Sequence, residues 1–282
     1  MSLIDKALLV QLNISQWTAR KYDRKATQNV AVNFNTTTSA GRYNKALLPM
    51  NDYLDRVHKK TTLIRTKFYT NTSPWGIEGT FMLSSKNYLP FTNEFRKERG
   101  EWQYLVDDFL NNYKDLKDNA KRFLNDLYDE TDYPPQDMLA KKFSMDLAIF
   151  PVPSTDFRVA IGDEELAEIQ KDVERRVMDA QNHAMQDLWD RLYKQVEHMT
   201  EKLSDPKAIF RDSMVDNARE LCSLLPRLNF TDDPNLENLR QQVEANIARH
   251  HPDALRNDPD LRQDTAAEAK AIMEKMKTFM GV

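Results

Sequence analysis

The sequence predicts a mostly α-helical fold: an elongated antiparallel helical bundle with two long, coiled-coil-like helices and a small β element. Two long stretches carry apolar residues at steps of three and four, which is the spacing of helices that pack against a neighbour. Glycine is scarce, at 6 of 282 residues, which argues against a sheet-rich fold with many tight turns. These observations favour a protein built mainly by helix packing.

The first 91 residues are expected to hold short, mixed elements. Apolar and polar residues alternate over residues 8–14, which predicts a strand. Ser15 is the expected cap of a following helix that carries Tyr22 and Val30.

Further along this region, residues 35–41 are polar and unpatterned and predict a loop. A helix is expected from about Pro49 to Tyr69. A small hairpin is expected over residues 79–89, with its turn at residues 84–87.

The first long helix is expected to begin at Thr92 or Asn93 and to end near Tyr128, before two consecutive prolines. Several of its inward side chains are large for a tight two-helix contact, which favours burial inside a bundle. The inward positions are Trp102, Val106, Phe109, Tyr113, Leu116, Ala120, Phe123 and Leu127.

Three shorter elements are expected next. Residues 136–143 predict a short helix, and the prolines within residues 150–153 predict extended chain. The alternation of Phe157, Val159 and Ile161 predicts a brief strand.

The second long helix is expected over residues 163–203, opened by three acidic residues that suit the positive helix N-terminus. At about 1.5 Å per residue, a helix of this length spans roughly 60 Å. Its inward positions are Ile169, Val173, Val177, Ala180, Ala184, Leu188, Leu192, Val196, Met199 and Leu203.

Three Asp-Pro pairs predict further helix starts, because Asp caps a helix well and Pro suits the first helical position. The pairs begin at Asp205, Asp233 and Asp258. Three segments are expected: a basic N-terminal region at 1–91, a long-helix bundle core at 92–230 and an acidic helical tail at 231–282.

Charge is distributed unevenly along the chain. Residues 1–75 carry 12 Lys and Arg against 4 Asp and Glu, a net of +8, and residues 163–282 carry 17 against 25, a net of −8. Opposite charge at the two ends indicates two different partners, or one end neutralising the other.

The composition also bounds the location of the protein. No apolar run approaches the roughly 18 residues needed to span a bilayer, and the first residues do not read as a signal peptide. Cys222 is the single cysteine, so no internal disulfide is expected. We therefore expect a cytoplasmic protein without membrane contact.

No catalytic residue, metal ligand or cofactor is predicted. The five histidines do not converge at ligand spacing, and the acidic pairs fall mostly at helix starts or on solvated faces. Cys222 lies on an apolar helical stripe and is expected to be a small core residue. Phosphate-loop and serine-hydrolase motifs are not present.

The basic N-terminal region supplies the candidate binding residues. Cations among aromatic residues are typical of single-stranded nucleic-acid binding, although an acidic protein would also suit a basic surface, and the aromatics suit a helical core equally well. The candidates are Arg20, Lys21, Arg24, Lys25, Arg42, Lys45, Lys59, Lys60, Arg65 and Lys67.

Short segments resemble a family of uncharacterised proteins found mainly in tailed phages and some bacteria. The segments are Leu-Val-Gln-Leu-Asn-Ile-Ser-Gln-Trp-Thr-Ala-Arg-Lys at residues 9–21, Phe-Pro-Val-Pro at 150–153 with Asp-Phe-Arg at 156–158, and Phe-Arg-Asp-Ser at 210–213. In that family the gene often lies beside a MoxR-type AAA+ ATPase and a protein with a von Willebrand A domain. The resemblance implies either of these as a protein partner, and transfers no functional residue.

Three functional hypotheses follow. The first is a non-enzymatic adaptor or substrate partner, phage-encoded, acting with an AAA+ ATPase complex in the host bacterial cytoplasm. The second is a nucleic-acid-binding accessory protein, whose affinity would fall steeply with salt. The third is a structural or assembly protein of the virion; homo-oligomer formation also stays open.

Overall fold

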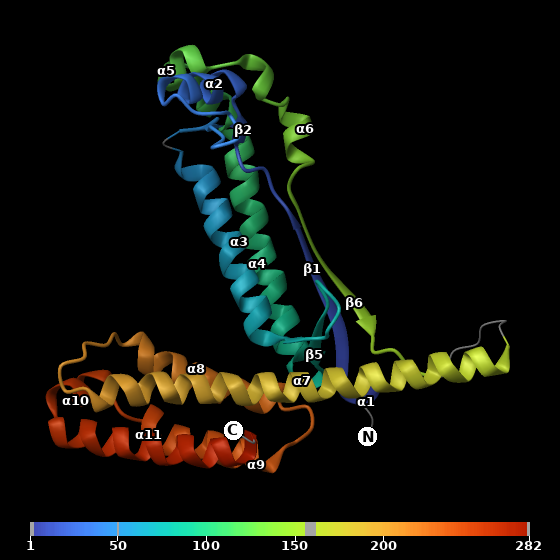
Figure 1. Ribbon diagram of the computed structural model, residues 1–282, viewed down its shortest axis with the longest axis vertical. Helices are drawn as coiled ribbons and strands as arrows, with labels where there is room; N and C mark the ends of the chain where they lie inside the picture. Colours follow the sequence, from blue (N-terminus) through green and yellow to red (C-terminus); the bar gives the residue numbers. More distant parts are fainter. Residues whose placement is uncertain (1–2, 50, 156–161, 281–282) are drawn as a thin grey trace. The chain divides into compact units, whose positions relative to one another are not determined.

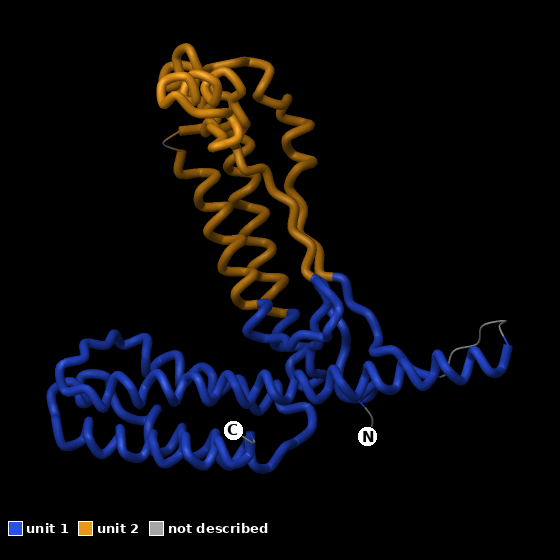
Figure 2. The backbone as a smooth tube through the Cα atoms, viewed as in Figure 1, with its two compact units in different colours: residues 1–11, 68–92, 148–282 blue, residues 12–67, 93–147 orange. Residues whose placement is uncertain are grey.

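The computed structural model describes residues 3–49, 51–155 and 162–280. Helices account for 68% of the structure, which confirms the prediction of a mostly α fold (Figure 1). The chain forms two compact units (Figure 2): unit 1 contains residues 1–11, 68–92 and 148–282, and unit 2 contains residues 12–67 and 93–147. The three-segment division predicted from the sequence stays a prediction.

The four-stranded sheet confirms the strand expected at residues 8–14. Its strands lie in the order β4 (Ser73–Pro74), β5 (Phe81–Ser84), β1 (Ala7–Ser15) and β6 (Ser144–Pro151). β1 pairs antiparallel with β5, with Ala7 opposite Ser84 and Val10 opposite Phe81. Sequence segments more than 60 residues apart are therefore joined by main-chain hydrogen bonds.

The predicted hairpin over residues 79–89 is only half right. β5 pairs with β4, and Gly76 and Gly79 take positive φ in the connection between them, a conformation that glycine adopts without strain. The turn expected at residues 84–87 is wrong, because helix α4 begins at Ser85. These polar residues suit a first helical turn, where main-chain N–H groups lack helical partners.

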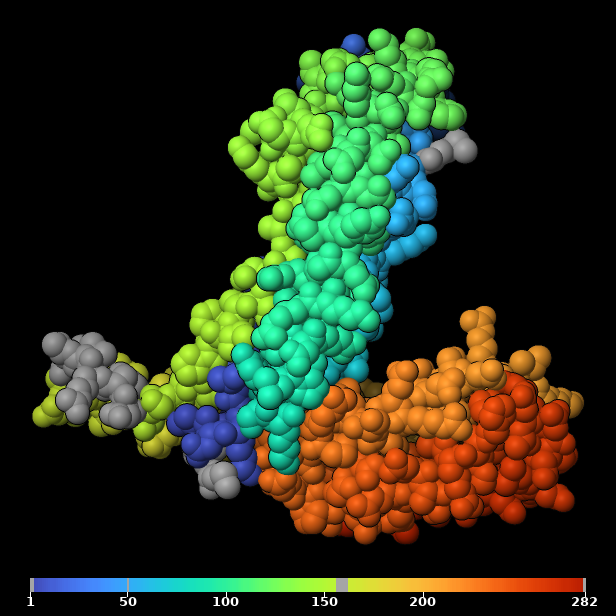
Figure 3. All heavy atoms as spheres, turned by 180° about the vertical axis from the view of Figure 1, so that it is seen from behind, coloured from blue at the N-terminus to red at the C-terminus, as the bar shows by residue number. Residues whose placement is uncertain are grey.

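Unit 1 is mainly helical. Its helices are α1 (Leu3–Lys6), α7 (Asp163–Ser204), α8 (Ser213–Leu228), α9 (Pro234–Val243), the π-helix η3 (Glu244–Ala248), α10 (Pro252–Asn257) and α11 (Pro259–Met280). Figure 3 shows the atoms of the orange and red C-terminal helices packed closely over one another. Their shared core takes Leu192 and Val196 from α7, Cys222 from α8, Leu239 from α9 and Ile272 from α11.

Helix α7 confirms the second long helix almost to the residue. Its predicted inward stripe is buried from Ala180 to Leu203, whereas Ile169 is exposed. A smaller apolar cluster joins Ala180 and Ala184 to Leu9 of β1 and to Trp75. The stripe predicted from spacing is therefore a core stripe over its C-terminal part.

Two of the three Asp-Pro pairs start helices as predicted. Asp233 accepts hydrogen bonds from the N–H groups of Asn235 and Leu236, and Asp258 caps α11 in the same way. The prediction at Asp205 is wrong, because this residue is the C-cap of α7. The Arg262 guanidinium donates to carbonyl oxygens of the chain between 202 and 208, which fixes that segment as a helix end.

Unit 2 contains most of α3 (Asp52–Asn71) and of α4 (Ser85–Asn111), which lie side by side (Figure 1). The indole N–H of Trp102 donates to Thr61 Oγ1 at 2.9 Å, and Arg56 bonds Asp108 at 3.2 Å. The earlier α3 residue, Arg56, pairs with the later α4 residue, Asp108, and Thr61 pairs with Trp102. The two helices therefore run antiparallel. The remaining elements of unit 2 are β2 (Arg20–Tyr22), α2 (Arg24–Asn33), β3 (Asn44–Ala46), α5 (Tyr113–Leu124), η1 (Asn125–Leu127), η2 (Glu130–Asp132) and α6 (Gln136–Ala140).

The first long helix differs from its prediction at both ends. It begins at Ser85 rather than near residue 92 and is interrupted at Asn112, after which α5 begins. Trp102 and Phe109 are buried as expected, but Phe123 is 59% exposed. Two predicted inward positions beyond the interruption, Tyr113 and Ala120, are still buried, so the predicted stripe continues into α5 and fails at Phe123.

Two predictions near the N-terminus need correction. No helix follows Ser15: β2 comes first, after the positive φ of Ala19, and Asp23 caps α2. The helix expected from Pro49 begins at Asp52. The strand predicted at residues 157–161 lies outside the described residues.

The antiparallel pair of α3 and α4 contains a buried ion cluster. Glu98, on α4, lies between the ammonium groups of Lys60 and Lys67 on α3, and Glu101 and Glu94 take the outer positions. Burial alone would raise the pKa of Glu98, but the two lysines outweigh burial and lower this pKa. A carboxylate at the centre of this contact is therefore held in its charged form.

Replacing Glu98 by Gln is expected to lower the free energy of unfolding at pH 7 by about 2–3 kcal/mol, because buried charge partners are lost. Since the folded-state pKa lies below its ordinary value of 4.5, this stabilisation exists above that value. It is lost as pH falls through the folded-state pKa. Urea unfolding at pH 7 and pH 3 measures both effects, with Glu101→Gln, at an exposed position, as the control. Equal stability of E98Q and wild type at pH 7 would contradict the role of the cluster.

Candidate functional site

The ten predicted binding residues all lie in unit 2, in two groups. One group is on α3: Lys59, Lys60, Arg65 and Lys67. The other is on a small segment made of β2, α2, the following loop and β3, here called the α2 segment (residues 20–46): Arg20, Lys21, Arg24, Lys25, Arg42 and Lys45.

The α3 group is partly neutralised within the unit. Lys60 and Lys67 form ion pairs with glutamates of α4. Within this group of four, only Lys59 and Arg65 are exposed. A lysine bound to two carboxylates has little remaining charge for a phosphate. This group is better explained by helix packing than by ligand binding.

Lys45 anchors the α2 segment. Its side chain is 6% exposed, and its ammonium group lies 2.7 Å from Asp132, 3.4 Å from Asp23 and 2.7 Å from the carbonyl oxygen of Leu127. Burial would lower the pKa of Lys45, but hydrogen bonds and charge attraction from the two aspartates outweigh it, and the pKa is raised. Lys45 is a structural cation.

The α2 segment is held by local hydrogen bonds. β2 and β3 pair antiparallel, with Lys21 opposite Lys45. The Asp23 N–H donates to the carbonyl of Tyr43 at 2.9 Å, and the Tyr43 N–H donates to Thr27 Oγ1 at 3.0 Å. These bonds tie the loop after α2 back to the start of the helix.

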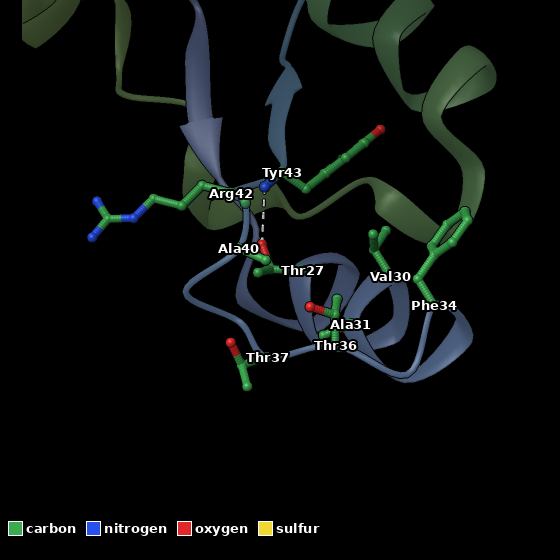
Figure 4. Close-up of a pocket in the computed structure, with 10 residues that line it drawn as sticks. Thr27, Val30, Ala31, Phe34, Thr36, Thr37, Ala40, Arg42 and Tyr43 are labelled. Atoms are coloured by element: carbon green, nitrogen blue, oxygen red, sulfur yellow. Dashed lines mark hydrogen bonds between the residues drawn. The ribbon is translucent and has the colours of Figure 1, made fainter.

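The loop and α2 enclose an apolar hollow of about 330 Å³. Figure 4 shows Val30 and Phe34 projecting from one side of α2, and Arg42 pointing away from them. The Phe34 side chain is 77% exposed and its neighbour Val32 is 74% exposed. The lining residues are Thr27, Val30, Ala31, Phe34, Thr36, Thr37, Ala40, Gly41, Arg42 and Tyr43.

A second hollow, of about 710 Å³, lies where the start of α2 meets residues 121–132. Its lining includes cations and anions: Arg24 and Lys25 lie on it together with Asp126 and Glu130. The positive charge of the segment is therefore partly balanced on this side, which the sequence count did not predict.

The exposed cations of the α2 segment include one beside an aromatic ring. The Cζ atom of Arg42 lies 5.9 Å from the ring centroid of Tyr22, and Tyr22 and Tyr43 are both exposed. By contrast, Trp17 packs against Phe109 at a centroid distance of 6.3 Å. Only some of the aromatics in the basic region can therefore meet a ligand.

Two observations concern chemistry in the parts of the chain that the structure describes. The Cys222 thiol is buried in the core of unit 1, and burial raises its pKa to about 12. The described residues contain no group of three His, Cys, Asp or Glu side chains that could hold a metal ion. No described helix has the length and apolar character to cross a membrane.

Sequence reasoning missed the apolar surface of the α2 segment. Val30 was expected only as part of a helix, and Val32 and Phe34 were not singled out. One signal was present: valines at 30 and 32 cannot both face the core from one helix, because residues two apart point to different sides.

Comparisons with family models, curated proteins and solved structures found no match to this chain. Its function must therefore be inferred from its own residues.

Replacing Lys45 by Met is expected to lower the free energy of unfolding by about 3 kcal/mol, because the buried Asp132 carboxylate loses its nearest cation. The matched control is Lys25→Met, at an exposed position of α2, which should change stability by less than about 0.5 kcal/mol. Denaturant unfolding followed by circular dichroism measures both. A stable K45M variant would show that Lys45 is available to a ligand after all.

Proposed function

We propose that this chain is a non-enzymatic protein-binding adaptor or substrate partner. The observation that carries the proposal is the apolar surface of the α2 segment, where Val32 and Phe34 are 74% and 77% exposed beside a preformed hollow. Clustered apolar side chains of this kind on a soluble surface typically mark a protein-binding site. Bulky aromatic residues are also enriched among the residues that dominate binding energy.

The identity of the partner comes from the resemblance rather than from the geometry. We propose that the chain is phage-encoded and acts with an AAA+ ATPase complex in the bacterial cytoplasm. A MoxR-type ATPase or its von Willebrand A domain companion is the proposed contact.

The long helices support a spacer role within this proposal. α7 has 42 residues, which corresponds to about 63 Å of helix. We propose that α7 and α4 act as coiled-coil-like helices of an elongated antiparallel bundle. The register of α3 and α4, set by Glu98 and Trp102, supports this arrangement for that pair.

Replacing Phe34 by Ser is expected to reduce capture of a protein partner at least tenfold, with little change in unfolding midpoint, because the ring is mostly exposed. The measurement is affinity purification of the tagged full chain from cells expressing the neighbouring genes, after nuclease treatment and at low and high salt. Tyr104→Ser is the matched control, since Tyr104 is an aromatic residue of similar exposure on α4. Equal recovery of the same partner by F34S and wild type would overturn the proposed site.

A second candidate function is single-stranded nucleic-acid binding by the α2 segment. The observation that favours it is Arg42 beside the exposed ring of Tyr22, with further exposed cations on the same segment. Base stacking combined with positive charge is the usual basis of such binding.

For this candidate, the double variant Arg24→Gln with Lys25→Gln is expected to weaken oligonucleotide binding and to flatten its salt dependence. Each lost phosphate contact changes the slope of log K against log salt by about 0.7, so the expected change is about 1.4. Titration of a labelled oligonucleotide at several salt concentrations measures it. Arg175→Gln with Arg176→Gln on α7 is the control for an equal loss of charge. An oligonucleotide affinity that does not change with salt concentration would reject this candidate.

A further inference from the structure

The hollow beside α2 has the features of a preformed site for one side chain of a partner. The loop wall is fixed to the helix at both ends: the Thr36 N–H donates to the carbonyl of Ala31 at 2.9 Å, and the Tyr43 N–H donates to Thr27 Oγ1 at 3.0 Å. Because the loop of this chain is already ordered, binding would not carry the entropy loss of ordering it. Its volume of about 330 Å³ falls within the range of small binding pockets.

The wall of this hollow carries one charged side chain, and it is positive. Arg42 is the only charged residue among those that line it. Arg24 and Lys25, at the start of α2, line the second hollow together with Asp126 and Glu130 and do not line this one. A partner with carboxylates near its apolar side chain would therefore be favoured over a neutral or basic one.

We propose that this hollow binds an acidic peptide segment of the partner protein, with one bulky apolar side chain of that segment inserted between Phe34 and the loop. This proposal rests on the proposed function and adds the chemistry of the partner. A nucleic acid fits the hollow less well, because the lining is mostly apolar side chains and threonines and holds only one cation for a chain of phosphates.

Gly41 is a lining residue of the hollow that can take a larger side chain without disturbing the fold. A Cβ atom built at Gly41 meets no atom within 4 Å, and this residue does not have the positive φ that would strain a larger side chain. Gly41→Leu therefore adds a bulky side chain to the wall of the site. Gly100→Leu on α4 is the matched control, because a Cβ there also meets no atom within 4 Å.

The test begins with a displayed library of random 12-residue peptides, selected on the immobilised full chain and depleted on the Gly41→Leu variant. The enriched peptides are expected to share an aromatic residue or leucine flanked by Asp or Glu. A fluorescently labelled enriched peptide should bind Gly41→Leu at least tenfold more weakly than wild type and bind Gly100→Leu equally. Arg42→Gln should weaken binding a few-fold and reduce its dependence on salt.

Three outcomes would overturn the proposal. They are enriched peptides without acidic residues, no enrichment over the Gly41→Leu variant, and full displacement of the peptide by a 12-nucleotide single strand. Suppose that Phe34→Ser loses partner capture and that the enriched peptides lack acidic residues. The adaptor function would then be supported, and only the acidic-peptide inference would be rejected. If acidic peptides bind in the hollow but Phe34→Ser leaves partner capture unchanged, the peptide site would be supported and the proposed role of this surface in the adaptor function would be rejected.

Discussion

The packing of α3 against α4 depends on one buried carboxylate. Glu98 accepts from Lys60 and Lys67, and a charge in this position is tolerated only because both cations are present. The same contacts align the two helices, since each lysine also reaches a second glutamate on α4. Unit 2 therefore uses charge to specify a helix register, and the lysines involved are lost to external ligands.

Lys45 repeats this arrangement in the α2 segment. Its contacts with Asp23 and Asp132 join β3 to the cap of α2 and to residues near the end of η2. Lys45 is therefore not available to an external ligand, whereas the other five predicted cations of the segment lie at exposed positions. Beside these cations the segment exposes Val32 and Phe34, the surface on which the proposed protein binding rests.

Local sequence patterns predicted local structure well. The α7 helix, the strand at 8–14 and the caps at Asp233 and Asp258 each depend on residues close together in the chain. The same Asp-Pro pattern failed at Asp205, where Arg262, 57 residues away, fixes a helix end. The pairing of Glu98 with Lys60 is also non-local, so the positive charge that the sequence suggested for binding could be discounted only from the folded structure. For the same reason the hollow was not predicted, because it needs α2 and its loop to fold together.

The single thiol of this chain is sealed within unit 1, with its proton held more tightly than in an exposed cysteine. A cysteine introduced on the surface would therefore be the only one to react with a maleimide under mild conditions. Thr37, on the loop that lines the hollow, is an exposed position for such a label. The natural sequence thus already serves as a cysteine-free background, and a probe can report on the α2 segment without prior removal of the native residue.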